Sequence, residues 1–165
     1  MPMPIDLQAL EEIKQLKYRY VRCVDRKLWA ELRETLAEDA TSSYGGGKYS
    51  FRGRDQIMAF LEKSMSSPKF LSSHTVHQPE IVLESPTRAR GIWALHDTVI
   101  NLEQGWTLNG SAFYEDVYVK GADGKWRIQH TGYTRTYEEI EQRAKTGAKV
   151  TDSFWGEREL KWDPV

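Results

Sequence analysis

The sequence predicts an α+β fold in which N-terminal helices cover one face of a strongly curved antiparallel sheet. Apolar residues recur at helical spacing through most of the first 65 residues, whereas four long strand-like segments follow, separated by short turns. Helices followed by a run of strands are typical of α+β proteins. The length of 165 residues suits one domain, which we assign to residues 1–147, followed by a polar tail at residues 148–165.

Three helices are expected before the strands. In the first, Leu10, Ile13, Leu16 and Tyr20 fall on one apolar stripe, and Asp6 precedes it in the position of an N-cap. Between the second and third helices, the letters YGGGKY indicate the turn of a short hairpin. The expected helices span residues 5–24, 27–37 and 54–65.

Four long strands make up the rest of the predicted domain. Turn-like pieces join them, and the last of these, ADGK, is a strong hairpin signal. The tail can be ordered only by packing on the body of the domain or on a neighbouring subunit. The expected strands span residues 74–85, 88–102, 106–120 and 125–139.

Composition and charge exclude several classes of function. The formal net charge is −1, and no basic stripe indicates a nucleic-acid partner. Cys23 is the single cysteine, so no intrachain disulfide can form, which fits a reducing compartment. The N-terminus has no basic start followed by an apolar run, so we expect no signal peptide, no membrane span and a cytoplasmic location.

Asp97 is the first candidate functional residue. Strand parity places it on the same face as Trp93, Leu95 and Val99, so a carboxylate stands in an apolar row. Because an unpaired buried carboxylate is costly, Asp97 requires either a partner or a water-filled cavity. A salt bridge and a functional site are equally good explanations from parity alone.

Two histidines lie in the first long strand. His77 shares its parity with Ile81 and Leu83, unless a bulge at Pro79 shifts the face. His74 stands three residues earlier, which on a strand sends the two rings to opposite faces and makes them a poor metal site. A lone strand histidine is more often structural than catalytic. We predict no metal, and no organic cofactor because no glycine-rich phosphate-binding loop precedes a helix.

Asp25 lies near the apolar side at the end of the first expected helix. It is either the N-cap of the second helix or a functional carboxylate. Tyr20, five residues earlier, lies squarely on the apolar face, so the two side chains converge only if the helix ends or bends near Asp25. The residues alone leave both readings open, and for Arg135 the default is an exposed strand charge.

Several of these stretches, taken together and in this order, resemble a known family. They are the Tyr20–Asp25 pair before KLW, HxxHxPEI, W-x-L-x-D and TGY-x-R. They are similar to SnoaL-like proteins of the nuclear-transport-factor-2-like superfamily, most of all to the bile acid 7α-dehydratases and more distantly to the scytalone dehydratases. The resemblance covers about residues 5–139. It implies a cone-shaped curved sheet around a pocket that the N-terminal helices close.

The resemblance also implies roles for particular residues. His77 would be the acid–base group, Asp97 would orient it, and Tyr20 with Asp25 would bind a carbonyl or enolate oxygen. Arg135 would hold one of the carboxylates or meet an acidic part of the substrate. The candidate pocket walls are Tyr44, Trp93, Phe113 and Tyr114, although strand parity allows only one of the last two.

The expected activity is a cofactor-independent dehydratase that removes water from a hydroxylated steroid or similar polycyclic ketone. Two alternatives remain: a dehydratase or polyketide isomerase–cyclase acting on a smaller ring, and a non-catalytic ligand-binding module of the same fold. The expected partners are a small-molecule substrate and other copies of the chain, which the resemblance suggests form a homotrimer.

Overall fold

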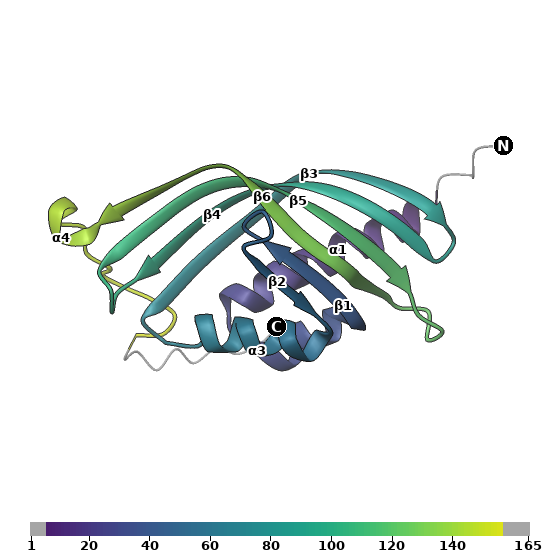
Figure 1. The fold of residues 1–165 in the computed structure, drawn as a ribbon, viewed down its shortest axis with the longest axis horizontal. Coiled ribbons are helices and arrows are strands. Elements are labelled where there is room, and N and C mark those ends of the chain that lie inside the picture. The colour runs from purple at the N-terminus through teal and green to yellow at the C-terminus, as the bar shows by residue number, and fades with distance from the viewer. Residues whose placement is uncertain (1–5, 157–165) are drawn as a thin grey trace.

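The computed structural model describes residues 6–156 and confirms the α+β class. In Figure 1 the sheet forms a long arch, and the helices α1 and α3 lie together on its concave side. The elements in chain order are α1 (Leu7–Asp25), α2 (Trp29–Thr35), β1 (Leu36–Tyr44), β2 (Tyr49–Arg52), α3 (Arg54–Met65), β3 (Phe70–Ser85), β4 (Arg88–Asn101), β5 (Trp106–Lys120), β6 (Trp126–Gln142) and α4 (Arg143–Thr146).

The sheet has six strands in the order β2-β1-β6-β5-β4-β3. Strands β3 to β6 form the expected antiparallel run, and β1 and β2 form the hairpin that YGGGKY indicates. Unlike the other pairs, β1 runs parallel to β6, which the sequence did not predict. No tight turn joins these two strands, so turn geometry does not fix their relative direction.

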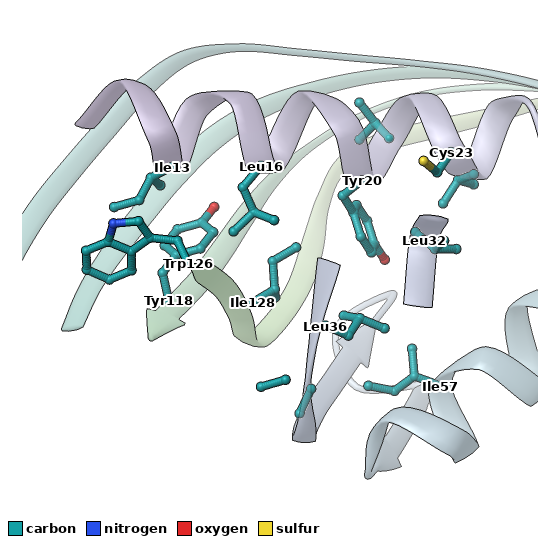
Figure 2. Packing of buried hydrophobic residues seen from close by; sticks show 14 of the residues in the cluster. Ile13, Leu16, Tyr20, Cys23, Leu32, Leu36, Ile57, Tyr118, Trp126 and Ile128 are labelled. Atoms are coloured by element: carbon teal, nitrogen blue, oxygen red, sulfur yellow. The ribbon is translucent and has the colours of Figure 1, made fainter. Parts of the chain in front are cut away.

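Helix α1 supplies much of the core. It begins after Asp6, whose side chain accepts a hydrogen bond from the backbone N–H of Ala9 at 2.9 Å, as a helix cap does. In Figure 2 its lower face projects Ile13, Leu16 and Tyr20 toward the sheet. The helix ends at Asp25, and Lys27 takes a left-handed backbone conformation (φ 53°). The helix therefore ends at the residue, Asp25, whose side chain turns inward.

Helix α2 is shorter than expected. The sequence predicted residues 27–37, but the helix begins at Trp29 and Leu36 already belongs to β1. Leu36 is fully buried and pairs with Ile128 of β6, so packing in the sheet overrides its preference for helix. The N-cap position is Leu28, which makes no side-chain cap, so Asp25 is not the cap of this helix.

Strand β3 contains a bulge that decides which side chains face inward. Gln78 has φ 51°, and the pairing with β4 slips between His77, opposite Ala94, and Glu80, opposite Ile92. A one-residue insertion in one strand reverses the alternation of faces. Ile81 therefore faces the core after the bulge, whereas His77 before it is exposed to solvent.

The first part of the C-terminal tail lies against the end of α1. The rings of Phe154 and Trp155 pack on the cationic groups of Arg26 and Lys27, at 4.7 and 5.1 Å from the ring centroids. Residues 157–165 of the tail, which we expected at a subunit interface, lie outside the described residues. Among the helices of residues 6–156, none is both long and apolar enough to cross a membrane.

Candidate active site

A cavity of about 600 Å³ opens between the concave face of the sheet, the end of α1, helix α3 and the β1–β2 hairpin. Its volume falls within the range of small-molecule sites. Most of the wall is apolar, and a few polar groups project into it. The apolar wall includes Phe60, Met65, Phe70, Val99, Trp106 and Leu108.

The first polar group is His74 with Asp25 behind it. His74 lies before the bulge on the inward face of β3 and lines the cavity. Its Nδ1 lies 2.6 Å from Oδ1 of Asp25, and its backbone N–H donates to Oδ2 of Asp25 at 2.8 Å. Ser72 donates a further hydrogen bond to Asp25 at 2.8 Å. Three hydrogen bonds from β3 thus fix the carboxylate at the end of α1.

This pairing determines what the imidazole can do. An Nδ1–H that donates to the carboxylate leaves Nε2 as the unprotonated nitrogen. Within residues 6–156, Nε2 of His74 has no hydrogen-bond partner, and His74 lines the cavity. A neutral imidazole in this state can accept a proton, and Asp25 then stabilises the imidazolium.

The second polar group is the ion pair of Asp97 and Arg135. Asp97 is 4% exposed, and both of its oxygens accept from the guanidinium, at 2.5 and 2.9 Å. Nε of Arg135 also lies 3.1 Å from Glu138. Burial lowers the pKa of Arg135, but the hydrogen bond and charge of Asp97 outweigh it, so the pKa lies above its ordinary value.

Arg135 reaches Asp97 across β5, and it can do so only because residue 110 is glycine. Gly110 of β5 pairs with Asp97 of β4 on one side and with Glu138 of β6 on the other. A Cβ at Gly110 would lie 2.3 Å from Nη1 of Arg135 and 3.0 Å from Oδ1 of Asp97. Because Gly110 has no side chain, the guanidinium of Arg135 can pass over β5 at this position.

Tyrosines form the third polar group. The hydroxyl groups of Tyr20 and Tyr44 lie 2.7 Å apart, and both side chains line the cavity together with Tyr114. Burial raises the pKa of Tyr20 well above its ordinary value, and Tyr44 and Tyr114 contribute; burial also raises the pKa values of these two phenols. All three phenols therefore remain protonated, and because one of Tyr20 and Tyr44 donates to the other, the second of that pair and Tyr114 can donate to a ligand oxygen.

A buried ion pair beneath this wall was missed by the sequence reasoning. Lys17 and Asp116 are both fully buried side chains, with Nζ and Oδ2 2.7 Å apart. The signals existed: Lys17 stands four residues after Ile13 on the apolar stripe of α1, and Asp116 lies between two inward tyrosines, Tyr114 and Tyr118. When two apolar faces pack together and one carries a lysine and the other an aspartate, an ion pair between them is expected.

The structure brings five of the predicted residues to the cavity wall, and Asp25 joins them through His74. The partner of Asp97 is Arg135, one of the options considered for that arginine, and not a histidine. The residues at the wall are Tyr20, Tyr44, Asp97, Tyr114 and Arg135.

Three sequence predictions about the wall are wrong. His77 is exposed on the outer face, because the bulge at Gln78 reverses the parity on which its placement relied. Phe113 alternates with Tyr114 and is 50% exposed on that same outer face. Trp93 faces inward, but Tyr18 of α1 covers it at 5.8 Å between ring centroids, so it is buried away from the cavity.

Metal ligands are not grouped in the part of the chain that the structure describes. No three His, Cys, Asp or Glu side chains in residues 6–156 lie close enough to hold an ion. Some polar groups of the cavity are instead paired with each other, as Asp97 is with Arg135 and Tyr20 is with Tyr44.

A family profile described as the SnoaL-like domain matches residues 6–132. The chain belongs to the SnoaL-like domain family. Solved structures agree in fold: a putative scytalone dehydratase from Novosphingobium aromaticivorans is 21% identical over 81% of this chain and 87% of that one, with a TM-score of 0.73. A hexachlorocyclohexane dehydrochlorinase of type 2 is 18% identical over 82% and 90%, with a TM-score of 0.72.

A third similar structure is ActVI-ORFA from Streptomyces coelicolor. It is 18% identical over 78% of this SnoaL-like chain and 98% of that protein, with a TM-score of 0.66. At these identities the likeness is one of fold, so function must be argued from the cavity.

Proposed function

We propose that this SnoaL-like protein is a cofactor-independent lyase that eliminates water from a hydroxylated ring ketone. The observation that carries the proposal is the His74–Asp25 pair, with Nδ1 of the imidazole held at 2.6 Å by the carboxylate and Nε2 unpartnered at the cavity. A base that is oriented by a third group and faces an apolar cavity is the arrangement that proton abstraction needs.

The reaction would take three steps. Nε2 of His74 removes a proton from the carbon next to, or conjugated with, the carbonyl group, and the C–H electrons move into the enolate. The hydroxyls of Tyr20, Tyr44 or Tyr114 stabilise the enolate oxygen by hydrogen bonds. The enolate electrons then form the new C=C bond, the C–O bond breaks, and the leaving hydroxide takes the proton from the imidazolium and departs as water.

Similar structures support the class of reaction. Two of them are a putative scytalone dehydratase and a hexachlorocyclohexane dehydrochlorinase, and these names describe the loss of water and of hydrogen chloride. The cavity supplies what such a reaction needs, namely one base, several neutral oxygen donors and apolar walls.

For the substrate we propose a hydroxylated steroid or similar polycyclic ketone. The sequence likeness to bile acid 7α-dehydratases suggests it, with the correction that His74, the first histidine of HxxHxPEI, takes the acid–base role. The cavity volume of about 600 Å³ and its mostly apolar wall suit a fused ring system. A smaller ring, as in scytalone, is the alternative within the same chemistry.

A ligand-binding module without catalysis is the alternative from another class. It would explain an apolar cavity, but it gives no reason for an imidazole held by a carboxylate that three hydrogen bonds from β3 fix at the end of α1. One measurement distinguishes the lyase from the binding module, namely whether the bound ligand is chemically converted.

The experiment is an absorbance assay with a 7α-hydroxy-3-oxo-Δ4 steroid. Wild type should form a longer conjugated dienone, seen as a new band at longer wavelength. His74→Ala should lower the rate by about 10²- to 10⁴-fold. His77→Ala is the matched control on the outer face and should leave the rate unchanged. Loss of activity in the control alone, or equal activity in both variants, would contradict the role of His74.

A steroid that binds unchanged to wild type would favour the smaller ring or the binding module. The same variants should then be tested with bicyclic and monocyclic β-hydroxy ketones. Turnover of these compounds would retain the lyase and change the substrate, whereas binding without turnover throughout the series would support the binding module.

A further inference from the structure

The buried ion pair of Lys17 and Asp116 has no part in the proposed reaction, yet it lies directly behind the cavity wall. Both side chains have no solvent exposure, and neither lines the cavity. Replacement of a buried ion pair by apolar groups of similar size is often neutral or stabilising. Stability alone therefore does not explain an ion pair in this position.

The ammonium group of Lys17 has three N–H bonds and three partners. Nζ lies 2.7 Å from Oδ2 of Asp116 and 3.5 Å from Oγ1 of Thr131. The third partner is the face of the Tyr114 ring, whose centroid is 3.4 Å away, and the Tyr20 ring lies at 5.1 Å. A cation over a ring at this distance is a close cation–π contact, and a desolvated one.

The Tyr114 ring that Lys17 contacts belongs to a side chain at the cavity wall. Tyr114 lines the cavity, and no described residue is a hydrogen-bond partner of its hydroxyl. A positive charge against the ring face withdraws electron density from the phenol and makes its O–H a stronger donor, and this acts against burial and the charge of Asp116, which raise the pKa of Tyr114. Only the Tyr114 ring separates the Lys17 ammonium from an oxygen that this hydroxyl binds, and the dielectric constant of these surroundings is low.

Asp116 is itself held in place from β4 and β5. The hydroxyl of Tyr118 donates to Oδ2 of Asp116 at 2.7 Å, and Nε1 of Trp93 donates to the Tyr118 oxygen at 2.9 Å. Burial lowers the pKa of Lys17, and the charge of Asp116 opposes this effect. The chain from Trp93 to Tyr118 to Asp116 thus fixes the position of the ammonium beneath Tyr114.

We propose that Lys17 is a positioning residue that strengthens Tyr114 as a hydrogen-bond donor to negative charge on a ligand oxygen. The inference rests on the proposed function, because an enolate oxygen is the charge that Tyr114 would meet. It adds that the substrate carries its carbonyl oxygen at the Tyr20–Tyr114 end of the cavity, above this ammonium.

The first test compares Lys17→Met with Lys17→Met/Asp116→Asn, because the double variant leaves no unpaired buried charge. Both should fold, and both should lower kcat roughly ten- to thirtyfold with little change in KM. A rise in KM with an unchanged kcat would overturn the proposal. Lys120→Met is the matched control, since Nζ of Lys120 lies 5.7 Å from the Trp126 ring centroid, outside the cavity.

A double-mutant cycle separates positioning from simple support of the fold. If Lys17 acts through the Tyr114 hydroxyl, the neutral pair should cost less than about twofold in kcat when Tyr114→Phe is already present. An equal cost in the two backgrounds would overturn the proposal and reduce the ion pair to a structural link between α1 and β5.

A second readout does not depend on turnover. Bound 4-nitrophenol reports the charge on its oxygen through its absorbance. Its pKa in the wild-type cavity should lie about one unit below that in Lys17→Met/Asp116→Asn, which corresponds to a tenfold effect. Equal values, or no bound signal in any variant, would overturn the inference. A shift in the probe without turnover of any ketone would instead retain Lys17 and reject the lyase.

Discussion

Nδ1 of His74 lies 2.6 Å from Oδ1 of Asp25, although the residue directly opposite His74 across the strand pair is Asp97. The imidazole thus has a carboxylate on each side, one from α1 and one from β4. Only the helix carboxylate is free to hold the ring, because Asp97 is occupied by Arg135. Because Asp25 and Asp97 have different partners, we make a separate prediction for each carboxylate.

Asp25→Asn should lower kcat by about 10²- to 10⁴-fold and leave the fold intact. The amide occupies the same space but does not stabilise an imidazolium, and it can favour the wrong tautomer of His74. Ser72→Ala is the control, because it removes one of the three hydrogen bonds to Asp25 and keeps the charge. Steady-state kinetics measures the effect, and equal losses in the two variants would contradict a role for the charge.

Gly110→Ala should separate Arg135 from Asp97. The new methyl would stand 2.3 Å from Nη1 of Arg135, so the guanidinium must move and leave a buried carboxylate unpaired. We expect a loss of about 3 kcal/mol or more in the free energy of unfolding. Urea denaturation measures it, and Ser111→Ala, one residue along the same strand, should change stability by less than about 0.5 kcal/mol.

Tyr20→Phe tests the hydroxyl pair at the cavity wall. It removes one partner of the 2.7 Å contact with Tyr44 and one donor toward the enolate oxygen. The kcat should fall about 10²-fold, since loss of one oxyanion donor has effects of that order. Tyr137→Phe, on an exposed residue, should have no effect. A change confined to KM would argue that Tyr20 binds the ground state and the transition state equally.

Cys23 should be unreactive in the native protein. The thiol is fully buried, and burial raises its pKa to about 11, so little thiolate exists near pH 8. Reaction with a chromogenic disulfide at pH 8 should follow unfolding. Because the folded pKa lies above the unfolded value, the folded state binds more protons and this contribution to stability is lost as pH rises from about 9 to 11. Fast labelling of the native protein would contradict the buried placement.

Much of the fold could be read from the sequence because its signals are local. The long strands alternate clearly, ADGK and YGGGKY mark hairpins, and Asp6 marks the start of α1. The end of α2 and the direction of β1 could not be read in this way. Leu36 suits a helix by its spacing, and only its burial against Ile128 makes it a strand residue.

The site was predicted less well, because it depends on contacts between distant elements. Parity predicted that Asp97 faces inward but left Phe113 and Tyr114 as alternatives, and the resemblance to known dehydratases added Tyr20, Asp25 and Arg135. His77 lies on the outer face and not on the inward face that its parity predicted, because a bulge has no reliable signal in a single sequence. Parity that continues through Pro79 without a change of face puts His77 and Ile81 on the same side, whereas the bulge puts them on opposite sides.

The bulge at Gln78 joins two patterns that would otherwise be out of phase. Before it, even-numbered positions such as His74 and Val76 point inward; after it, odd-numbered positions such as Ile81 do. One strand thereby lines the cavity with its first half and packs against the hydrophobic core with its second. Loss of that single residue would bring the two halves into one phase, so that either His74 would turn away from the cavity or Ile81 would turn away from the hydrophobic core.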